Sequence, residues 1–317
     1  MKYKYLIIDM SNLFWRCVVK SSDNFLTIEG HEIYNFVIQN VLERIKELRE
    51  RFGYDDSKLY FLLDNSQSKI NIRKILDSEY KHSREYKNVP KHLYSTLNFF
   101  IEILKCYSDD FYFVNEDGFE ADDLTLPIKE YLYDVHRDDI GDNFLLFISN
   151  DLDWARNIDI YCHFFNFYNL YTVQSFKEKY KFSPEGKNIQ IYKTLKGDKS
   201  DNIQIPIPYL PEEVVLYIIE TYNNIDHFYR NLMNDKDISD KWCKRFLEEE
   251  EQIRKNWNLV DFILLDKNVE KIIFKCKENI KKLRFWFDLL KIPYESRMVD
   301  VEKDKNILFK KRMLPRV

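Results

Sequence analysis

The chain has 317 residues, of which 45% are hydrophobic, and carries a formal net charge of −4 at pH 7. This length suffices for one large domain or for a domain with a helical annex, and no apolar run is long enough to cross a bilayer. The apolar run at residues 5–8 is too short for a signal peptide, so we expect a cytoplasmic protein, in the host cytoplasm if it is phage-encoded. Five scattered cysteines without a CxxC pair predict small core residues, and exclude a disulfide framework or a zinc site.

Four short apolar runs predict buried strands at residues 4–9, 59–64, 111–114 and 144–148. Helical spacing of apolar residues between and after them predicts helices over 11–20, 31–52, 93–107 and from 124 onward. Continuous apolar strands that alternate with helices are typical of an α/β fold whose largely parallel central sheet is covered by helices.

The later part of the chain changes character. Residues 159–173 predict an aromatic hairpin and residues 189–195 a helix, and beyond Pro211 the sequence is helical and amphipathic to about residue 290. We therefore expect an α/β domain over 1–205 with a basic, aromatic segment at about 65–92. A helical part over 206–295 and a basic tail over 296–317 follow it.

Carboxylates gather where the predicted strands end. In a parallel sheet, ligands bind outside the carboxyl ends of the strands, so these side chains should converge on one edge. The predicted group is Asp9, Asp64, Glu120, Asp122, Asp123, Asp151, Asp153, Asp198 and Asp201. Each acid also has an ordinary interpretation, as a turn former, a helix cap or a complement to a helix dipole. Convergence of all of them favours a functional site.

So many carboxylates in one cleft cannot all stay ionised without cations. Oxygen ligands without an accompanying histidine or cysteine suit Mg²⁺ or Mn²⁺, and two such ions a few ångström apart form the clamp used to cleave phosphodiesters. A net charge of −4 argues weakly against a nucleic-acid partner. Removing nine negative charges from −4 leaves +5, so the chain outside this predicted site is mildly basic.

Five motifs carry a family resemblance. They are Ile8-Asp9-Met10-Ser11-Asn12-Leu13, Leu63-Asp64, Glu120-Ala121-Asp122-Asp123, Ser149-Asn150-Asp151-Leu152-Asp153 and Gly197-Asp198-Lys199-Ser200-Asp201-Asn202. In order and spacing they resemble the 5′-nucleases, which include flap endonucleases and the 5′–3′ exonuclease domains of bacterial DNA polymerase I. Within that family the chain is most similar to the ribonucleases H of T-even-type phages. The match covers about residues 3–205, with a weaker one at 258–262.

The resemblance implies two metal positions. One would be lined by Asp9, Asp64 and Asp122, with Glu120 acting directly or through water. The other would be lined by Asp151, Asp153 and Asp201, with Asp123 between the two and Asp198 outside the inner ligands. Asp122 and Asp151 would also count among the catalytic residues.

The resemblance further implies a helical arch within the basic segment. Tyr80-Lys81 and Arg84 match the family's YKxxR signature, so Lys81 and Arg84 would grip the scissile phosphate as catalytic residues and Arg73 would contact it. The ordinary alternative is a solvated basic helix. Tyr80 could stack on a frayed 5′ base or pack the arch onto the body, and packing is favoured. The predicted nucleic-acid contacts are Arg73, Lys74, Tyr80, Lys81, Arg84, Lys87, Lys196 and Lys199, with Lys193 as a further candidate.

One segment departs from the family. After the GDxxDN motif the family usually has a glycine-rich hairpin that binds duplex backbone, often with a potassium ion. Residues 203–210 contain no glycine. Because close approach of backbone to phosphates usually needs glycine, the duplex grip and the potassium site are in question.

The resemblance implies a metal-dependent 5′–3′ exonuclease or flap endonuclease with two Mg²⁺ or Mn²⁺ ions. It would act on DNA or RNA:DNA hybrids with a free 5′ end or flap, as in primer removal during replication. A PIN-type ribonuclease is one alternative, although PIN domains are smaller and lack the arch and the GDxxDN loop. A nucleic-acid-binding protein with a vestigial acidic site is another. We expect a monomer without membrane contact, and a sliding clamp or single-strand DNA-binding protein is a candidate partner.

Overall fold

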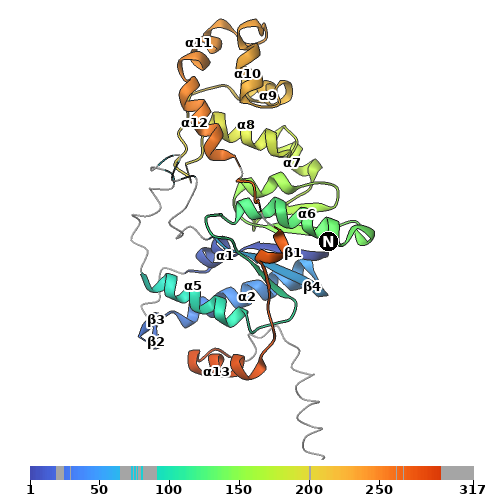
Figure 1. Cartoon of the computed structure of the whole chain (residues 1–317), viewed down its shortest axis with the longest axis vertical. Helices are drawn as coiled ribbons and strands as arrows, with labels where there is room; N and C mark the ends of the chain where they lie inside the picture. The colour runs from blue at the N-terminus through green and yellow to red at the C-terminus, as the bar shows by residue number, and fades with distance from the viewer. Residues whose placement is uncertain are drawn as a thin grey trace, which may run out of the picture.

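The computed structural model describes residues 1–18, 25–28, 30–64, 73, 75, 77, 80, 91–199, 201–261, 263–266 and 268–293. Its centre is a mixed sheet in the order β8-β7-β6-β1-β4-β5-β9 (Figure 1). The strands are β1 (Tyr3–Asp9), β4 (Gly53–Leu62), β5 (Phe111–Val114), β6 (Leu145–Ile148), β7 (Cys162–Phe165), β8 (Leu170–Tyr171) and β9 (Ile273–Lys275). The five inner strands pair in parallel and the two edge strands pair antiparallel. The predicted α/β fold with a largely parallel sheet is confirmed.

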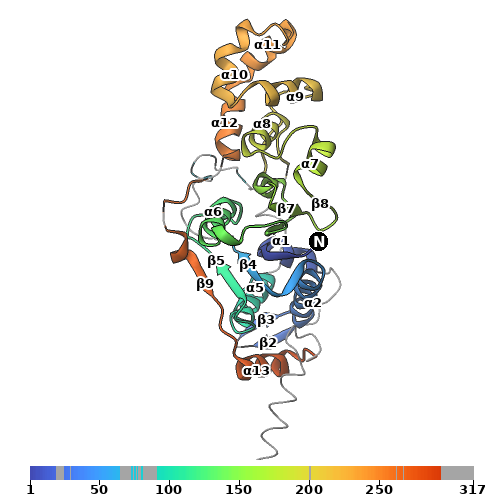
Figure 2. The same cartoon turned by 90° about the vertical axis from the view of Figure 1, so that its right-hand side faces the viewer.

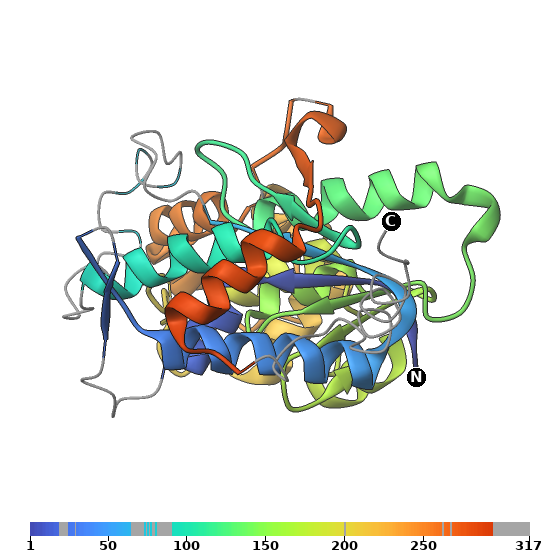
Figure 3. The ribbon, with the colours of Figure 1, turned by 90° about the horizontal axis from the view of Figure 1, so that it is seen from below.

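The sheet is buried on both faces because successive side chains of each strand point in opposite directions. Leu6 and Ile8 of β1 face one core, which α1 (Met10–Cys17), α2 (Asn35–Phe52), α5 (Lys91–Leu104) and α13 (Ile280–Leu290) cover. Figure 3 shows α2, α5 and α13 lying across this face. Tyr5 and Ile7 face the other core, which contains α6 (Thr125–Val135) and α8 (Gly186–Lys196). Continuous apolar stretches in the inner strands, such as residues 5–8 of β1 and 59–62 of β4, therefore dictate a two-sided core.

Beyond the sheet, a helical part extends along the long axis of the molecule (Figures 1 and 2). It contains α9 (Glu212–Thr221), α10 (Ile225–Asn231), α11 (Asp240–Glu248) and α12 (Glu250–Val260), with α7 (Val173–Tyr180) and α8 connecting it to the sheet. Buried Asn256 of α12 donates hydrogen bonds to the carbonyls of Thr194 and Gln204, at 3.0 and 2.8 Å. These bonds fix α12 against α8 and the loop that follows it.

Two segments differ from the sequence-based expectation. The helix predicted over 31–52 begins at Asn35, because His31–Ile33 (β3) pairs antiparallel with Leu26–Ile28 (β2) and buries Ile28 and Ile33. The helix predicted through residue 290 is interrupted by β9, which pairs with the edge strand β5. Ile273 and Phe274 of β9 are residue types that suit strand pairing, and β5 offers an unpaired edge. Residues 273–290 thus return to the sheet and its lower face (Figure 3).

Among the described residues, no helix combines the length and the hydropathy that crossing a bilayer requires. All five cysteines are free, and Cys106, Cys162 and Cys276 are buried, which agrees with the predicted role as small core residues.

Candidate functional site

The carboxyl ends of β1 and β6 are tied together by one serine. Asp9, the last residue of β1, caps α1 by accepting a hydrogen bond from the Asn12 amide at 2.8 Å. Its other oxygen accepts a bond from the Ser149 hydroxyl at 2.7 Å. The Asp151 amide donates to the same hydroxyl at 3.1 Å. Ser149 therefore fixes the position of Asp9 relative to the acidic loop after β6.

The ends of β4 and β5 are tied in a similar way. Asp64, two residues beyond β4, accepts a hydrogen bond from the Ala121 amide at 2.9 Å. Ala121 lies in the acidic turn after β5, directly before a short 3₁₀ helix, Asp122–Leu124. The acids that follow four parallel strands thus meet at one edge of the sheet, as the strand order requires.

Three of these acids form a group that could hold a metal ion. Asp122, Asp151 and Asp153 each offer one carboxylate oxygen, and these oxygens lie within 4.8 Å of one another. Oxygen Oδ1 of Asp153 is buried and accepts no hydrogen bond from the described part of the chain; Nη2 of Arg156 lies 3.6 Å away. A buried carboxylate oxygen is costly without a partner, and a divalent cation would satisfy it. The residues fit a divalent metal ion.

Crowding and burial shift the pKa values of the carboxylates at this edge of the sheet. Burial and the neighbouring Asp64 raise the pKa of Asp9 to about 7. Burial likewise raises the pKa of Asp151 to about 6, against the attraction of Lys193. Burial also disfavours ionised Asp153, but Lys193 and Arg156 outweigh it and lower the pKa of that carboxyl. A bound cation would favour the ionised form of all three.

Asp123 occupies a different position from its neighbour Asp122. Its two oxygens accept bonds from Nη1 and Nη2 of Arg73 at 2.9 and 2.7 Å. They also accept bonds from the amides of Glu120 and Ile263, at 3.1 and 3.0 Å. With four donors at its buried carboxylate, Asp123 links the acidic turn to the segment after α12 in this structure, and its role as a metal ligand stays a prediction.

Arg73 is held by contacts inside the protein. Its guanidinium is buried, pairs with Glu120 at 3.2 Å as well as with Asp123, and donates to the carbonyls of Leu259 and Asp261 at 3.1 and 2.9 Å. Burial opposes the charge, but the Asp123 carboxylate holds the pKa of Arg73 well above its ordinary value. Arg73 therefore forms an internal ion pair in this structure, and its contact with a phosphate stays a prediction.

Tyr80 packs in the same place. It is buried, and its hydroxyl donates to the Glu120 carboxylate at 3.1 Å. This arrangement agrees with packing of the arch onto the body, the role that the sequence favoured. Nearby, Asp77 pairs with Lys255 of α12 at 2.9 Å. The predicted contacts Lys74, Lys81, Arg84 and Lys87 lie outside the described residues.

The acids of the GDxxDN loop surround a lysine. Nζ of Lys193 lies 2.7 Å from Asp198 and 3.7 Å from Asp201, and 2.6 Å from Asp153. Burial disfavours the ammonium, but the carboxylates around it raise the pKa of Lys193 well above its ordinary value. The sequence suggested Lys193 only as a phosphate contact. It missed Arg156 altogether, although a residue three positions after Asp153 lies on the same side of a helical turn.

The same loop requires its glycine. Gly197 has φ +70°, and a Cβ there would lie 2.8 Å from the Ile203 carbonyl oxygen. The Asp198 and Ile203 backbones are bridged, which sets the direction of the acidic side chains. Of the two predicted phosphate contacts nearby, Lys196 pairs with Glu212 at 3.1 Å and Lys199 is exposed.

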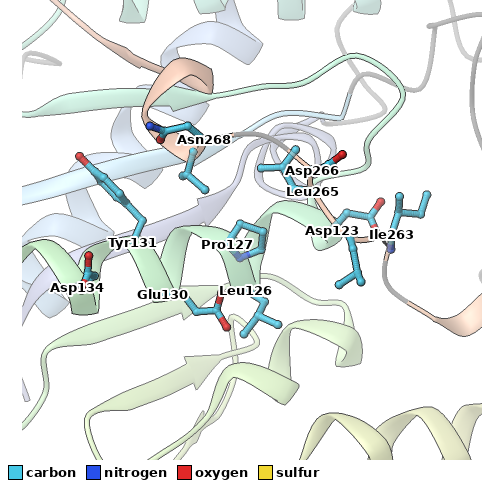
Figure 4. Close-up of a pocket in the computed structure, with 12 residues that line it drawn as sticks. Asp123, Leu126, Pro127, Glu130, Tyr131, Asp134, Ile263, Leu265, Asp266 and Asn268 are labelled. Atoms are coloured by element: carbon cyan, nitrogen blue, oxygen red, sulfur yellow. Dashed lines mark hydrogen bonds between the residues drawn. The ribbon is translucent and has the colours of Figure 1, made fainter.

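A separate cavity of about 820 Å³ lies behind the acidic turn, between α6 and residues 263–269. Leu126, Pro127 and Glu130 form one wall, and Ile263 and Leu265 lie opposite (Figure 4). Among the predicted acids only Asp123 lines it. This cavity is therefore distinct from the carboxylate group that could hold metal.

The fold of this chain is similar to that of solved 5′-nucleases. A scan against family models and a search of curated proteins found no match. A variant of the bacteriophage T5 flap endonuclease, in a product complex with DNA and metal ions, superimposes with a TM-score of 0.60 at 17% identity, covering 90% of this chain and 99% of that chain. The T5 5′-exonuclease with bound zinc gives 0.61 at 20% identity, covering 81% and 89%. Human GEN1 with Holliday junction DNA gives 0.54 at 17% identity, covering 92% and 69%. At these identities the likeness shows the 5′-nuclease fold; the closer resemblance to the T-even-type ribonucleases H stays a prediction.

Proposed function

We propose that this protein is a metal-dependent 5′-nuclease that hydrolyses phosphodiester bonds in DNA or RNA:DNA hybrids. The observation that supports this most is the meeting of Asp122, Asp151 and Asp153 at the carboxyl edge of the sheet. Carboxylate oxygens grouped at the carboxyl ends of parallel strands suit divalent ions. One solved structure with this fold is a variant of the T5 flap endonuclease in a product complex with DNA and metal ions.

Bound Mg²⁺ or Mn²⁺ would activate a water molecule and stabilise charge on the scissile phosphate. Asp122, Asp151 and Asp153 would hold the first ion, with Asp9 and Asp64 beside it. Asp198 and Asp201 belong to the second position. Arg73, Asp123 and Tyr80 would serve the site indirectly, because their bonds fix the acidic turn that carries Asp122. Lys81 and Arg84 stay the candidates for contact with the scissile phosphate.

The proposed substrates have a free 5′ end or a 5′ flap, as in the removal of RNA primers or flaps during replication. The expected products are short 5′-phosphorylated oligonucleotides. We propose that the protein acts as a monomer, with a sliding clamp or a single-strand DNA-binding protein as a candidate partner.

The test compares a 5′-labelled RNA primer on DNA with a 5′-flap duplex, with Mg²⁺ and with chelator. The variants are Asp122→Asn and, as a matched control, Asp134→Asn, which removes an exposed carboxylate from the far end of α6. Wild type and the control should release short 5′ products with Mg²⁺ only, and Asp122→Asn should be reduced at least about a hundredfold, as for loss of a group that stabilises transition-state charge. Intact substrates in every lane, with a salt-sensitive gel shift, would instead indicate a nucleic-acid-binding protein that lacks the chemistry.

A further inference from the structure

Lys193 lies at the centre of the second carboxylate group. Its ammonium nitrogen is 2.6 Å from Oδ2 of Asp153 and 2.7 Å from Oδ2 of Asp198. Oxygens of Asp201 and Asp151 lie at 3.7 and 3.9 Å. The lysine side chain is only 4% exposed. An ammonium group has three donors, and two short contacts and two longer ionic contacts place it where it interacts with four carboxylates at once.

The two parts of the acidic edge therefore differ in their cations. Oδ1 of Asp153 has an ion-pair contact with Nη2 of Arg156 at 3.6 Å, and it accepts no hydrogen bond from the described part of the chain. The opposite oxygen of Asp153 faces Lys193. Asp153 thus has an ammonium in close contact with one oxygen and a more distant guanidinium beside the other.

We propose that the Lys193 ammonium is the resident cation of the group formed by Asp151, Asp153, Asp198 and Asp201. The protein free of nucleic acid would then bind one divalent ion, at the Asp122 side of Asp153. A second ion could enter only when Lys193 withdraws. This inference refines the metal sites of the proposed nuclease, but the binding stoichiometry it concerns can be measured without any cleavage.

Displacement of Lys193 has a physical cost. Its ammonium would lose two short charge-assisted bonds in a buried site, and a buried ammonium needs another anion to replace them. A phosphodiester oxygen brought to this edge would be such an acceptor. Occupation of the second metal position is therefore coupled to binding of nucleic acid, and a metal ion alone has to compete with the lysine for the same oxygens.

The test is a titration of the full chain with Mn²⁺ under nucleic-acid-free conditions, by calorimetry and by electron paramagnetic resonance of free Mn²⁺. Wild type should bind one ion per chain at millimolar metal. Lys193→Met should bind two, the second at least about tenfold more tightly than any second ion of wild type, a factor that corresponds to about 1.4 kcal/mol. Lys193→Gln is a second neutral variant, and circular dichroism confirms folding.

Lys129→Met is the matched control, because Lys129 is also mostly buried and ion-paired, with Asp159 at 2.7 Å, but lies away from the acidic edge. It should bind one ion, as wild type does.

Wild type with two ions of similar affinity, or one ion in both neutral variants, would overturn the proposal, and no binding at all would overturn the metal centre too. If wild type binds two ions and cleaves its substrate with Mg²⁺, the proposed nuclease function holds and the role of Lys193 is refuted. If the measured stoichiometries agree with the proposal but no substrate is cleaved, the role of Lys193 stands and the proposed nuclease function fails.

Discussion

Asp122 and Asp123 are adjacent in sequence, and the structure predicts opposite consequences when each is changed to asparagine. Asp123→Asn changes one oxygen to an amide nitrogen. If the amide replaces Oδ2, it faces Nη1 of Arg73 and the Glu120 amide, at 2.9 and 3.1 Å. If it replaces Oδ1, it faces Nη2 of Arg73 and the Ile263 amide, at 2.7 and 3.0 Å. In either orientation the N–H groups of the new amide face N–H groups of Arg73 and of the backbone, so donors meet donors.

The expected magnitude follows from burial. Arg73 and Asp123 are both almost inaccessible to solvent, with side-chain exposures of 4% and 0%. Breaking a buried ion pair from one side costs about 3–5 kcal/mol, because the remaining charge stays buried without its partner. We expect Asp123→Asn to lower the free energy of unfolding by about that amount. Asp122→Asn removes one negative charge from a crowded group, so the metal-free protein should be as stable as wild type or more stable.

The assay is urea unfolding, followed by tryptophan fluorescence in the presence of chelator. The double variant Arg73→Met with Asp123→Leu should be less destabilised than Asp123→Asn alone, because it leaves no unpaired charge. Added Mg²⁺ should stabilise wild type and not Asp122→Asn. A loss below about 1 kcal/mol for Asp123→Asn, the range of exposed ion pairs, would refute the structural role argued for this residue.

Two further predictions concern pH and the glycine of the acidic loop. The pKa of Asp9 rises from its ordinary value to about 7 on folding, so the folded state binds more protons than the unfolded state between about pH 4 and pH 7, and stability of the metal-free protein should fall as pH rises through that window. Urea unfolding at several pH values checks this; a flat profile, or one that is the same with and without Mg²⁺, would contradict it. Gly197→Ala should destabilise the protein by at least about 1 kcal/mol, because the residue has positive φ and a Cβ would clash with the Ile203 carbonyl, whereas Gly141→Ala, with open space around it, should not. Equal stability of the two alanine variants would show that the loop rearranges without cost.

Much of the architecture could be predicted from local patterns. The apolar runs that became β1, β4, β5 and β6 are strongly patterned, and strands that alternate with helices require a parallel sheet. Parallel strands bring their carboxyl ends to one edge of a sheet. The convergence of Asp9, Asp64 and the two later acidic motifs therefore followed from the parallel direction of the strands. The hairpin of β2 and β3, and the return of β9 to the edge of β5, could not be predicted, because short strands are set by partners distant in sequence.

The partition of the acids depended on the tertiary structure. Nothing in the Glu120–Asp123 turn distinguishes Asp122, which faces the metal group, from Asp123, which faces Arg73. The difference arises because Arg73 and residues 259–263 are brought beside that turn from distant parts of the chain. In the same way, Lys193 appeared to be a candidate phosphate contact until α8 placed its ammonium among four carboxylates. Local sequence determines which charges a protein carries, and only the packing of distant segments determines which of them neutralise one another.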